Sequence, residues 1–427
     1  FSGKVVAKFE IDRPKIYLNL KQIQAEATSK TSLKERGWQK AVKDIYPFKI
    51  NLLTITNGDV IYIDQDSKRP LHLSKINLQA GNIRNIRSPD RVYPCPFYLE
   101  MVIFGIGHGF VKGRANFLAE PFPGINADFK LEKVPLDYFR PVLTRVNLSI
   151  NKGEFFTSGT MEYAPKVKKA HVKNLTIKNL EINYFHTAGT AAAEKERAIK
   201  GKKAAGKVSN KPGILLRLDQ LNLTRSTIGI INKSVSPSYR VFLADADVHI
   251  TNLSNHFEQG PAKVYIRGKF MGSGDTIAVA YFRPEKEGPD FDINLKIVDT
   301  KLASMNNLLR VYGNFDVQAG FFSFYTELHI RDNAVSGYVK PLFRDIKVYD
   351  NRNDKEKSAF HKAYKMLVGG IARLLENRPR KEVATKADIT GPVASPKAST
   401  LQIIGQLIKN AFFKAILPGF EQEIGKQ

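Results

Sequence analysis

Apolar and polar residues alternate along most of residues 46 to 350, and this period of two is the strongest constraint on the fold. Successive side chains of a β-strand point to opposite faces, so the alternation predicts strands with one apolar face and one polar face. Few helical stretches interrupt it, which favours a mainly β protein built on extended antiparallel sheet. The clearest runs are Leu71–Leu78, Leu216–Leu223, Val241–Ile250, Val264–Phe270, Ile277–Phe282 and Phe291–Val298.

A turn is predicted at Asn57-Gly58. An alternating run from Phe48 to Leu52 precedes this pair, and a second run from Val60 to Asp64 follows it. Asn-Gly between two alternating runs is typical of a tight β-hairpin, because both residues adopt positive φ at low cost.

The sequence also indicates an internal duplication at an offset of about 167 residues. The shared glycines fall at expected turns and bulges, where positive φ or a close backbone approach is needed. The positions Tyr98, Gly105, Gly107, Gly153 and Phe155 fall on Tyr265, Gly272, Gly274, Gly320 and Phe322, and residues 172–175 fall on 339–342. Sheet units repeated in this way and stacked end to end predict an elongated object.

Repeat and composition together divide the chain into five segments. Residues 1–45 are expected to hold the end of a preceding β unit and a linker, 46–186 the first β repeat unit, and 214–350 the second. Residues 187–213 carry many lysines and almost no large apolar residues, which predicts a basic, flexible linker with no more than a turn or two of helix. Residues 351–427 are expected to form a C-terminal helical segment.

Two amphipathic helices are predicted in that last segment, over residues 358–375 and 401–417, because apolar residues recur there every three or four positions. Basic residues flank both apolar faces. The helices could cap the open end of a sheet, or they could dock on a membrane surface or a partner. The candidate docking residues are Phe360, Tyr364, Leu367, Ile371, Ile404, Ile408 and Phe412.

The chain has 66 Lys and Arg against 41 Asp and Glu, a formal charge of +25. Such a field favours anionic partners, namely anionic lipid head groups, lipopolysaccharide or nucleic acid, and it also serves solubility. The single cysteine, Cys95, is expected to pack rather than to react. The chain already alternates from Phe1 onward, so we expect the natural N-terminus, with any signal peptide or anchor, to lie upstream. No run of about 18 apolar residues occurs in the chain.

The sequence shows no arrangement of residues typical of a catalytic, metal or cofactor site. The eight histidines include no His-x-x-x-His pair, and neither Gly-x-Ser-x-Gly nor a phosphate-binding loop occurs. The run from Gly105 to Gly109 lacks the third glycine of a dinucleotide fingerprint, so a turn between strands is expected there. We therefore expect a protein that is not an enzyme, with no metal and no cofactor.

Several segments resemble a bacterial family, the domain-of-unknown-function 748 branch of the AsmA-like proteins. The most specific resemblance is the run from Val335 to Val348, which contains Gly-Tyr-Val-Lys-Pro-Leu-Phe. The other segments are Ile11–Tyr17, Pro47–Ile50, Leu53–Asp64 and the tail Asn410–Gly419. Together they cover most of the chain.

The resemblance implies an inner-membrane anchor upstream, a body in the periplasm, and a curved, groove-like antiparallel β-sheet. It also implies involvement in phospholipid movement between inner and outer membrane, as in the architecturally similar bridge-like lipid transfer proteins. An apolar groove would bind acyl chains by removing their CH₂ groups from water. The rival interpretation is an ordinary sandwich, in which a second sheet covers the same residues. The expected lining is Ile50, Leu52, Ile61, Ile63, Leu71, Leu73, Leu216, Leu218, Val264, Ile266, Ile277 and Val279.

Three functions remain open from the sequence. The first is binding or transfer of phospholipid or another acyl lipid between the two membranes of the envelope, with a further envelope protein as a possible partner. The second is a periplasmic structural or assembly factor for outer-membrane proteins, which would offer sheet edges to a client strand. The third, nucleic-acid binding, rests on the net charge alone, and no nucleic acid is expected as a partner.

Overall fold

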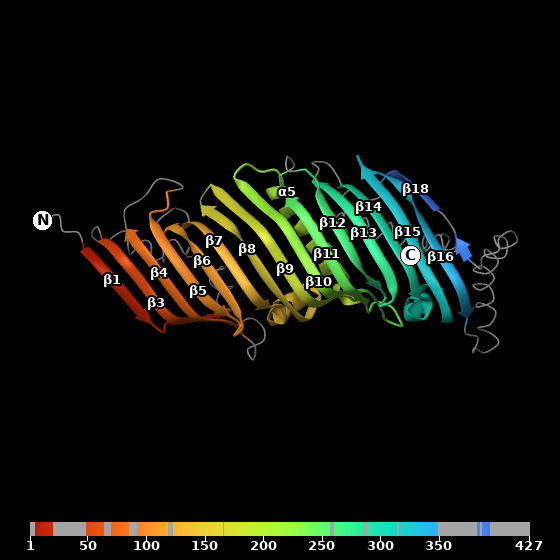
Figure 1. The fold of residues 1–427 in the computed structure, drawn as a ribbon, viewed down its shortest axis with the longest axis horizontal. Coiled ribbons are helices and arrows are strands. Elements are labelled where there is room, and N and C mark those ends of the chain that lie inside the picture. Colours follow the sequence, from red (N-terminus) through yellow and green to blue (C-terminus); the bar gives the residue numbers. More distant parts are fainter. Residues whose placement is uncertain are drawn as a thin grey trace. The chain divides into compact units, whose positions relative to one another are not determined.

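The structure is a computed structural model that describes residues 5–19, 48–63, 70–84, 92–117, 123–164, 166–256, 260–284, 289–313, 316–348, 382–384 and 387–392. It divides into two compact units, many of whose strands are labelled in Figure 1. Unit 1 comprises residues 1–180, 210–222 and 254–256, and unit 2 comprises residues 181–209, 223–253 and 257–427. Three strands, β9 (Val167–His186), β10 (Ile214–Asn232) and β11 (Tyr239–Ser254), contribute residues to both units.

Unit 1 is an open sheet in which consecutive strands from β3 to β8 pair antiparallel. The first two strands instead pair parallel with β3. A short helical connection of η1 (Leu136–Phe139), α4 (Arg140–Leu143) and η2 (Thr144–Val146) joins β7 to β8. The strands are β1 (Val5–Asp12), β2 (Lys15–Asn19), β3 (Phe48–Ile63), β4 (Leu71–Arg84), β5 (Cys95–Ile103), β6 (Gly107–Asn116), β7 (Gly124–Pro135) and β8 (Leu148–Ala164).

Unit 2 follows the same plan, with antiparallel pairing from β11 through β16. Its helical connection, η5 (Leu302–Met305) and α6 (Asn306–Gly313), joins β14 to β15. The strands are β12 (Ala262–Phe270), β13 (Gly274–Pro284), β14 (Pro289–Lys301), β15 (Val317–Arg331) and β16 (Ala334–Val348), and β16 also pairs antiparallel with β17 (Glu382–Ala384) and β18 (Ala387–Pro392).

The prediction of a mainly β protein built on an open, antiparallel sheet is confirmed. In the described part of each unit the strands belong to one sheet, and no second sheet packs on it as a sandwich would require. The two amphipathic helices predicted over 358–375 and 401–417 lie outside the described residues, as do all seven candidate docking residues on them.

The segment between β9 and β10 differs from the predicted flexible linker. It forms η3 (Ala188–Thr190) and an 18-residue helix, α5 (Ala191–Val208). The side chains of Thr187 and Thr190 bond each other's backbone N–H groups in a capping box, and the Ala, Glu, Lys and Arg that follow are strong helix formers. Local propensity therefore suffices to form a helix in a segment that lacks a wide apolar face.

This helix connects two parallel strands. In unit 1, the Lys168 N–H donates to the Gly213 carbonyl at 2.8 Å, next to the start of each strand. In unit 2, the Lys233 N–H donates to the His186 carbonyl at 2.8 Å, at the other end of both strands. Like ends are thus adjacent, so β9, α5 and β10 form a β-α-β crossover, the connection that parallel strands require.

The turn predicted at Asn57-Gly58 is wrong, because β3 continues through it from Phe48 to Ile63. Asn57 has positive φ (52°), but it forms a β-bulge where the register with β4 shifts between Ile55 and Val60. The Asn77 side-chain oxygen accepts the Asn57 N–H at 3.0 Å, a bond that a hairpin turn would not make. Asn-Gly supplies the same backbone conformation to a bulge as to a turn.

The duplication is visible in local hydrogen bonds as well as in the order of elements. The Phe104 N–H donates to the His72 carbonyl in unit 1, and the Met271 N–H donates to the Phe242 carbonyl in unit 2, both at 2.9 Å. Phe104 and Met271 have positive φ, 53° and 50°, and each is followed by a positive-φ glycine. Both units therefore share a backbone scaffold down to individual left-handed residues.

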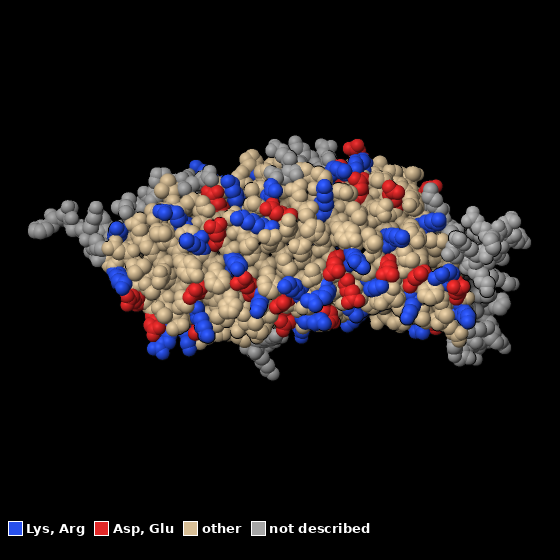
Figure 2. Space-filling view, in the orientation of Figure 1, with Lys and Arg blue, Asp and Glu red and all other residues tan. Residues whose placement is uncertain are grey.

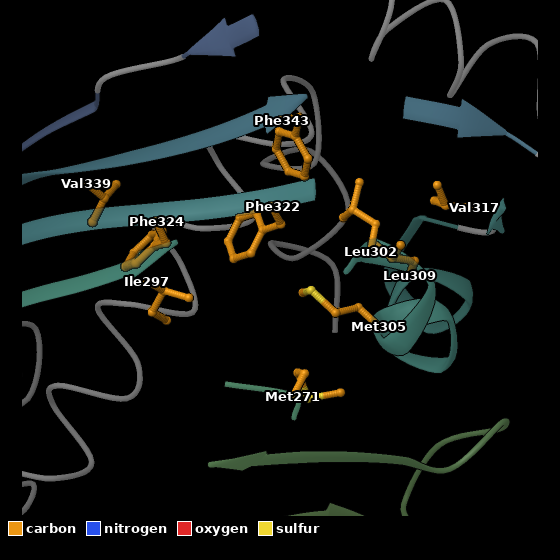
Figure 3. Packing of buried hydrophobic residues seen from close by; sticks show 10 residues of the cluster. All are labelled: Met271, Ile297, Leu302, Met305, Leu309, Val317, Phe322, Phe324, Val339 and Phe343. Atoms are coloured by element: carbon orange, nitrogen blue, oxygen red, sulfur yellow. The ribbon is translucent and has the colours of Figure 1, made fainter. Parts of the chain in front are cut away.

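The largest buried clusters lie in unit 2, on the face to which β14, β15 and β16 contribute aromatic residues. Phe322, Phe324 and Phe343 pack beside Leu302 and Met305 of η5 (Figure 3). Phe322 and Phe343 are 5.3 Å apart between ring centroids. The helical connection of unit 2 thus contributes side chains to its core.

Candidate functional site

The candidate site is one face of the sheet in unit 1. Paired residues on neighbouring strands point to the same side, so the registers define a row that begins with Leu78 on β4 and continues through Leu99, Val111 and Phe129 on β5, β6 and β7. We call the following set the apolar face of unit 1: Leu53, Ile55, Leu78, Phe97, Leu99, Met101, Val111, Phe129, Leu131 and Met161.

On β6 and β7 the opposite side is mostly polar. Residues next in sequence to members of the apolar face point there, among them Glu100, Lys112 and Asp128. Lys130 and Glu132 form an ion pair at 2.7 Å on this side. Figure 2 shows Lys and Arg interspersed with Asp and Glu over one face of the molecule, so neither sign of charge forms a continuous area on the side shown.

None of the ten side chains of the apolar face of unit 1 is buried. Residues with little side chain fill the buried positions beside them, including Ala80, Ala115 and Ala127. A further member of the same face, Tyr163 on β8, is 44% exposed. Large apolar side chains that stay partly exposed keep apolar surface in contact with water, and a group that covered them would remove this surface from water.

Among the described residues of unit 1, a buried cluster of large side chains forms where β5 meets the helical connection. Ile103, Phe104 and Val134 are buried there, and the Phe104 ring stacks on the Tyr138 ring at 5.0 Å between centroids. The cluster anchors one end of the apolar face of unit 1 and leaves the rows of β5 to β8 beyond it half exposed.

Four of the twelve lining residues expected from the sequence lie where a lining would be. Leu71 and Leu73 pack against the Phe104 cluster in unit 1. In unit 2, Val264 packs against a buried cluster, and Ile266 points to the same side because both lie on β12 two positions apart.

The remaining eight fall elsewhere, so the expected set does not form one lining. Ile50 and Leu52 alternate with Leu53 and therefore point away from the apolar face of unit 1, and Ile61 and Ile63 point away from the side of Leu73. In unit 2, Ile277 and Val279 pair with Arg267 and Tyr265 on the side opposite Val264. Leu216 is 44% exposed and Leu218 is partly exposed.

The cause is the register between neighbouring strands, which alternation within one strand does not specify. Ile61 pairs with His72 and not with Leu71 or Leu73, and Ile277 pairs with Arg267 and not with Ile266. Strict alternation missed Val111, because Gly107, Gly109 and Gly113 interrupt the pattern on β6, and Tyr98 and Val102 weaken it on β5, where Phe97 and Leu99 lie. The glycines themselves were the available signal, since they share this face with the large residues.

Several histidines in the described residues are hydrogen-bonded to carboxylates. His171 bonds Asp219 at 2.7 Å, and His186 bonds Glu194 at 2.8 Å. Burial raises the pKa of the Cys95 thiol to about 11, which opposes nucleophilic chemistry at this residue. No group of three or more His, Cys, Asp or Glu in the described part of the chain is arranged to hold a metal ion.

None of the described helices combines the length and the apolar character needed to cross a membrane. Comparison of the chain with models of protein families, with curated proteins and with solved structures finds no match.

Proposed function

We propose that the apolar face of unit 1 binds the acyl chains of phospholipids or related lipids, in a non-enzymatic protein of the bacterial envelope. The observation that carries the proposal is the partial exposure of ten large apolar side chains that follow one another across six strands. A continuous apolar surface of this kind on a folded protein marks a binding site for an apolar partner.

A lipid acyl chain can cover this surface without requiring hydrogen-bonding groups of the protein to rearrange. Each CH₂ removed from water contributes about 0.8 kcal/mol, so a chain of a dozen such groups contributes roughly 10 kcal/mol before the cost of ordering it. Acyl chains carry no hydrogen-bonding groups, and the side chains in the row that contains Leu78 and Leu99 offer none either. The polar opposite side can remain in water.

The resemblance of the sequence to AsmA-like proteins supports the same proposal and supplies the cellular setting. In that setting the chain would lie in the periplasm, held to the inner membrane by an upstream anchor, and its apolar face would bind or conduct lipid between the inner and outer membranes. The positive net charge of +25 suits anionic head groups at either surface.

Native mass spectrometry combined with lipid extraction tests the proposal on the full chain. We expect at least one phospholipid per chain after purification, and uptake of lipid from vesicles by delipidated protein. A folded chain that stays free of lipid in the presence of vesicles would overturn the proposal and favour an assembly factor.

Two adjacent residues of β5 provide a matched pair of variants. Leu99 belongs to the apolar face of unit 1, whereas its neighbour Tyr98 points to the polar side and is exposed. Leu99→Asp places a charge among the acyl chains and should reduce bound lipid at least about tenfold, because an unpaired charge is costly in apolar surroundings. Tyr98→Asp should leave it unchanged. Circular dichroism confirms that both variants fold; equal lipid content in the two would contradict the assigned face.

A further inference from the structure

The strand β1 lies at the edge of unit 1 (Figure 1), and β1 and β2 leave large apolar side chains in solvent. Both pair with β3, which lies on one side of them. Phe9, Ile11, Ile16, Tyr17 and Leu18 are 40–62% exposed. Charged residues alternate with them, Lys8, Glu10 and Lys15 among them, but the unpaired backbone groups of a long edge remain a template for a further strand.

The duplication identifies which element this edge corresponds to. β1 and β2 run parallel to β3, as β9 runs parallel to β10, and in each case the second strand starts the antiparallel series of its unit. The correspondence extends to single residues: Arg13, Asn179 and Asp345 follow one another at intervals of 166 residues and have φ of 52°, 53° and 53°. Thus β1 with β2, β9, and β16 are three copies of one strand type.

In the two complete copies, the other side of this strand is covered. β8 is the neighbour of β9, and β15 pairs antiparallel with β16. Both covering strands place a glycine of positive φ against the residue that follows the left-handed one. A Cβ on Gly153 would lie 3.1 Å from Leu180 Cα, and a Cβ on Gly320 would lie 3.0 Å from Ile346 Cα. The φ of the two glycines is 137° and 129°.

We infer that the outer edge of β1 and β2 accepts an antiparallel strand of the same type as β8 and β15, belonging to a further repeat of this kind. Its glycine would lie against Pro14, which occupies the position of Leu180 and Ile346 in the third copy. Backbone hydrogen bonds to the edge would supply affinity, and the glycine would fix the register. A second copy of the chain does not offer this strand, since its own β8 and β15 are already paired on both sides.

A peptide with the sequence of β8, residues 148–164, is the probe. We expect it to bind the full chain and to slow amide hydrogen exchange in residues 5–19, while exchange in β9 stays unchanged. A photoreactive benzoylphenylalanine in place of Tyr17, the most exposed residue of the edge, should crosslink to the peptide. Because the peptide acts at an edge and not on the apolar face of unit 1, the Leu99→Asp protein should bind it as the unmodified chain does.

The matched control is the same peptide with Gly153→Val. A β-branched residue is strained at the φ of this glycine and its Cβ would crowd the neighbouring backbone, so we expect affinity to fall at least about tenfold. A peptide with Ser158→Thr should bind like the original. The inference is overturned if residues 5–19 gain no protection, if the valine peptide binds equally well, or if protection appears in β9. Protection of 5–19 without peptide at high protein concentration would identify a second copy as the occupant and would also overturn it.

Discussion

The two units carry the same rows of paired residues on β7 with β8 and on β14 with β15, but they fill them differently. At one row unit 1 has Ile125 opposite Tyr163, and unit 2 has Phe291 opposite Ile330. Tyr163 is 44% exposed, whereas Phe291 and Ile330 are both 0% exposed. One backbone scaffold therefore supports a half-open face in the first unit and a closed core in the second.

The helical connections extend the contrast. In unit 2 the turns after β14 bury Leu302, Met305 and Leu309 against the sheet. In unit 1 no residue of the described turns η1, α4 and η2 is buried. Unit 2 therefore covers its own apolar surface with helix and aromatic side chains, whereas the described part of unit 1 leaves that surface partly exposed.

The largest expected effect is a difference in stability between equivalent truncations. Phe291→Ala removes a fully buried ring that lies 6.0 Å from the Phe282 ring, and it should cost about 3–5 kcal/mol of unfolding free energy. Ile125→Ala, at the matching position of unit 1, should cost less than about 2 kcal/mol, because the isoleucine is only partly removed from water. Urea unfolding followed by circular dichroism measures both.

Equal costs for the two truncations would show that the face of unit 1 is closed in solution, and the proposed lipid site would lose its basis. Adding phospholipid sharpens the test. Lipid should raise the cost of Ile125→Ala, since the side chain then has a partner, and should leave the cost of Phe291→Ala unchanged.

The strands and the duplication could be predicted from the sequence, because period two and recurring glycines are local signals that no tertiary contact is needed to read. The faces could not. Bulges at Asn57, Lys75 and Asp245, all with positive φ, exchange the two sides within single strands. Asn-Gly specifies the conformation at Asn57 but not whether the chain turns or continues, which depends on the Asn77 side chain 20 residues away.

The alternation of apolar and polar residues also could not predict how exposed the candidate site is. Met161 and Leu328 are similar in sequence terms, yet one is partly exposed and the other is 0% exposed. The difference arises from their partners across the strands, since Met161 faces Ala127 and Leu328 faces Ile293. The burial of a side chain depends on its neighbours in the row of paired residues, and those neighbours are known only once the strand register is known.

A second prediction compares the small buried positions that the two units share. Cys95 is 1% exposed, and its burial raises the pKa of the thiol to about 11. This pKa is two pH units above the usual 9.0, so the fraction of Cys95 present as thiolate falls about a hundredfold. Iodoacetamide at pH 8 should therefore label the folded chain at least about a hundredfold more slowly than the chain in urea.

The matched controls place a cysteine elsewhere in a Cys95→Ala background. Ala262→Cys, at the equivalent buried position of unit 2, should be equally inert, and Tyr163→Cys on the half-open face should react quickly. Fast labelling of Cys95 in the folded chain would mean that the sheet of unit 1 opens at β5. The two units would then differ in the local stability of their sheets and not in the exposure of their apolar faces.

A third prediction concerns acid, to which unit 2 should respond more than unit 1. Burial alone would raise the pKa of Asp292, but hydrogen bonds from Arg331, His329 and Arg283 outweigh it and lower the pKa far below the usual 3.8. Arg331 Nη2 donates to both carboxylate oxygens at 2.9 and 2.8 Å. The ionised Asp292 carboxylate stabilises the fold above about pH 4. This stabilisation is lost progressively as the pH falls from there through the lowered pKa of the folded state.

Asn126 occupies the position in unit 1 that Asp292 occupies in unit 2, so a carboxylate at this position is particular to unit 2; the carboxylate of that row in unit 1 is Glu162, opposite Asn126. Asp292→Asn should therefore cost about 1–2 kcal/mol at pH 7 and clearly less at pH 2. Urea unfolding at both pH values gives the two differences. A cost that stays constant from pH 7 to pH 2 would mean that the carboxylate does not stabilise the fold through its charge.

The smallest effect tests whether the shared scaffold is as equivalent in solution as its dihedral angles indicate. Gly105 and Gly272 have φ of 78° and 76° in corresponding turns. A Cβ on Gly105 would meet nothing within 4 Å, and one on Gly272 would meet the Phe242 ring at an ordinary 3.6 Å. The cost of alanine at either site is therefore the cost of left-handed backbone alone, about 1–2 kcal/mol, and the two costs should agree within about 0.5 kcal/mol. Asparagine, which tolerates this conformation, should recover part of the loss at both sites. A cost confined to one unit would show that the two turns differ in the free energy they contribute, and the contrast between the faces would then begin in the backbone and not in the side chains.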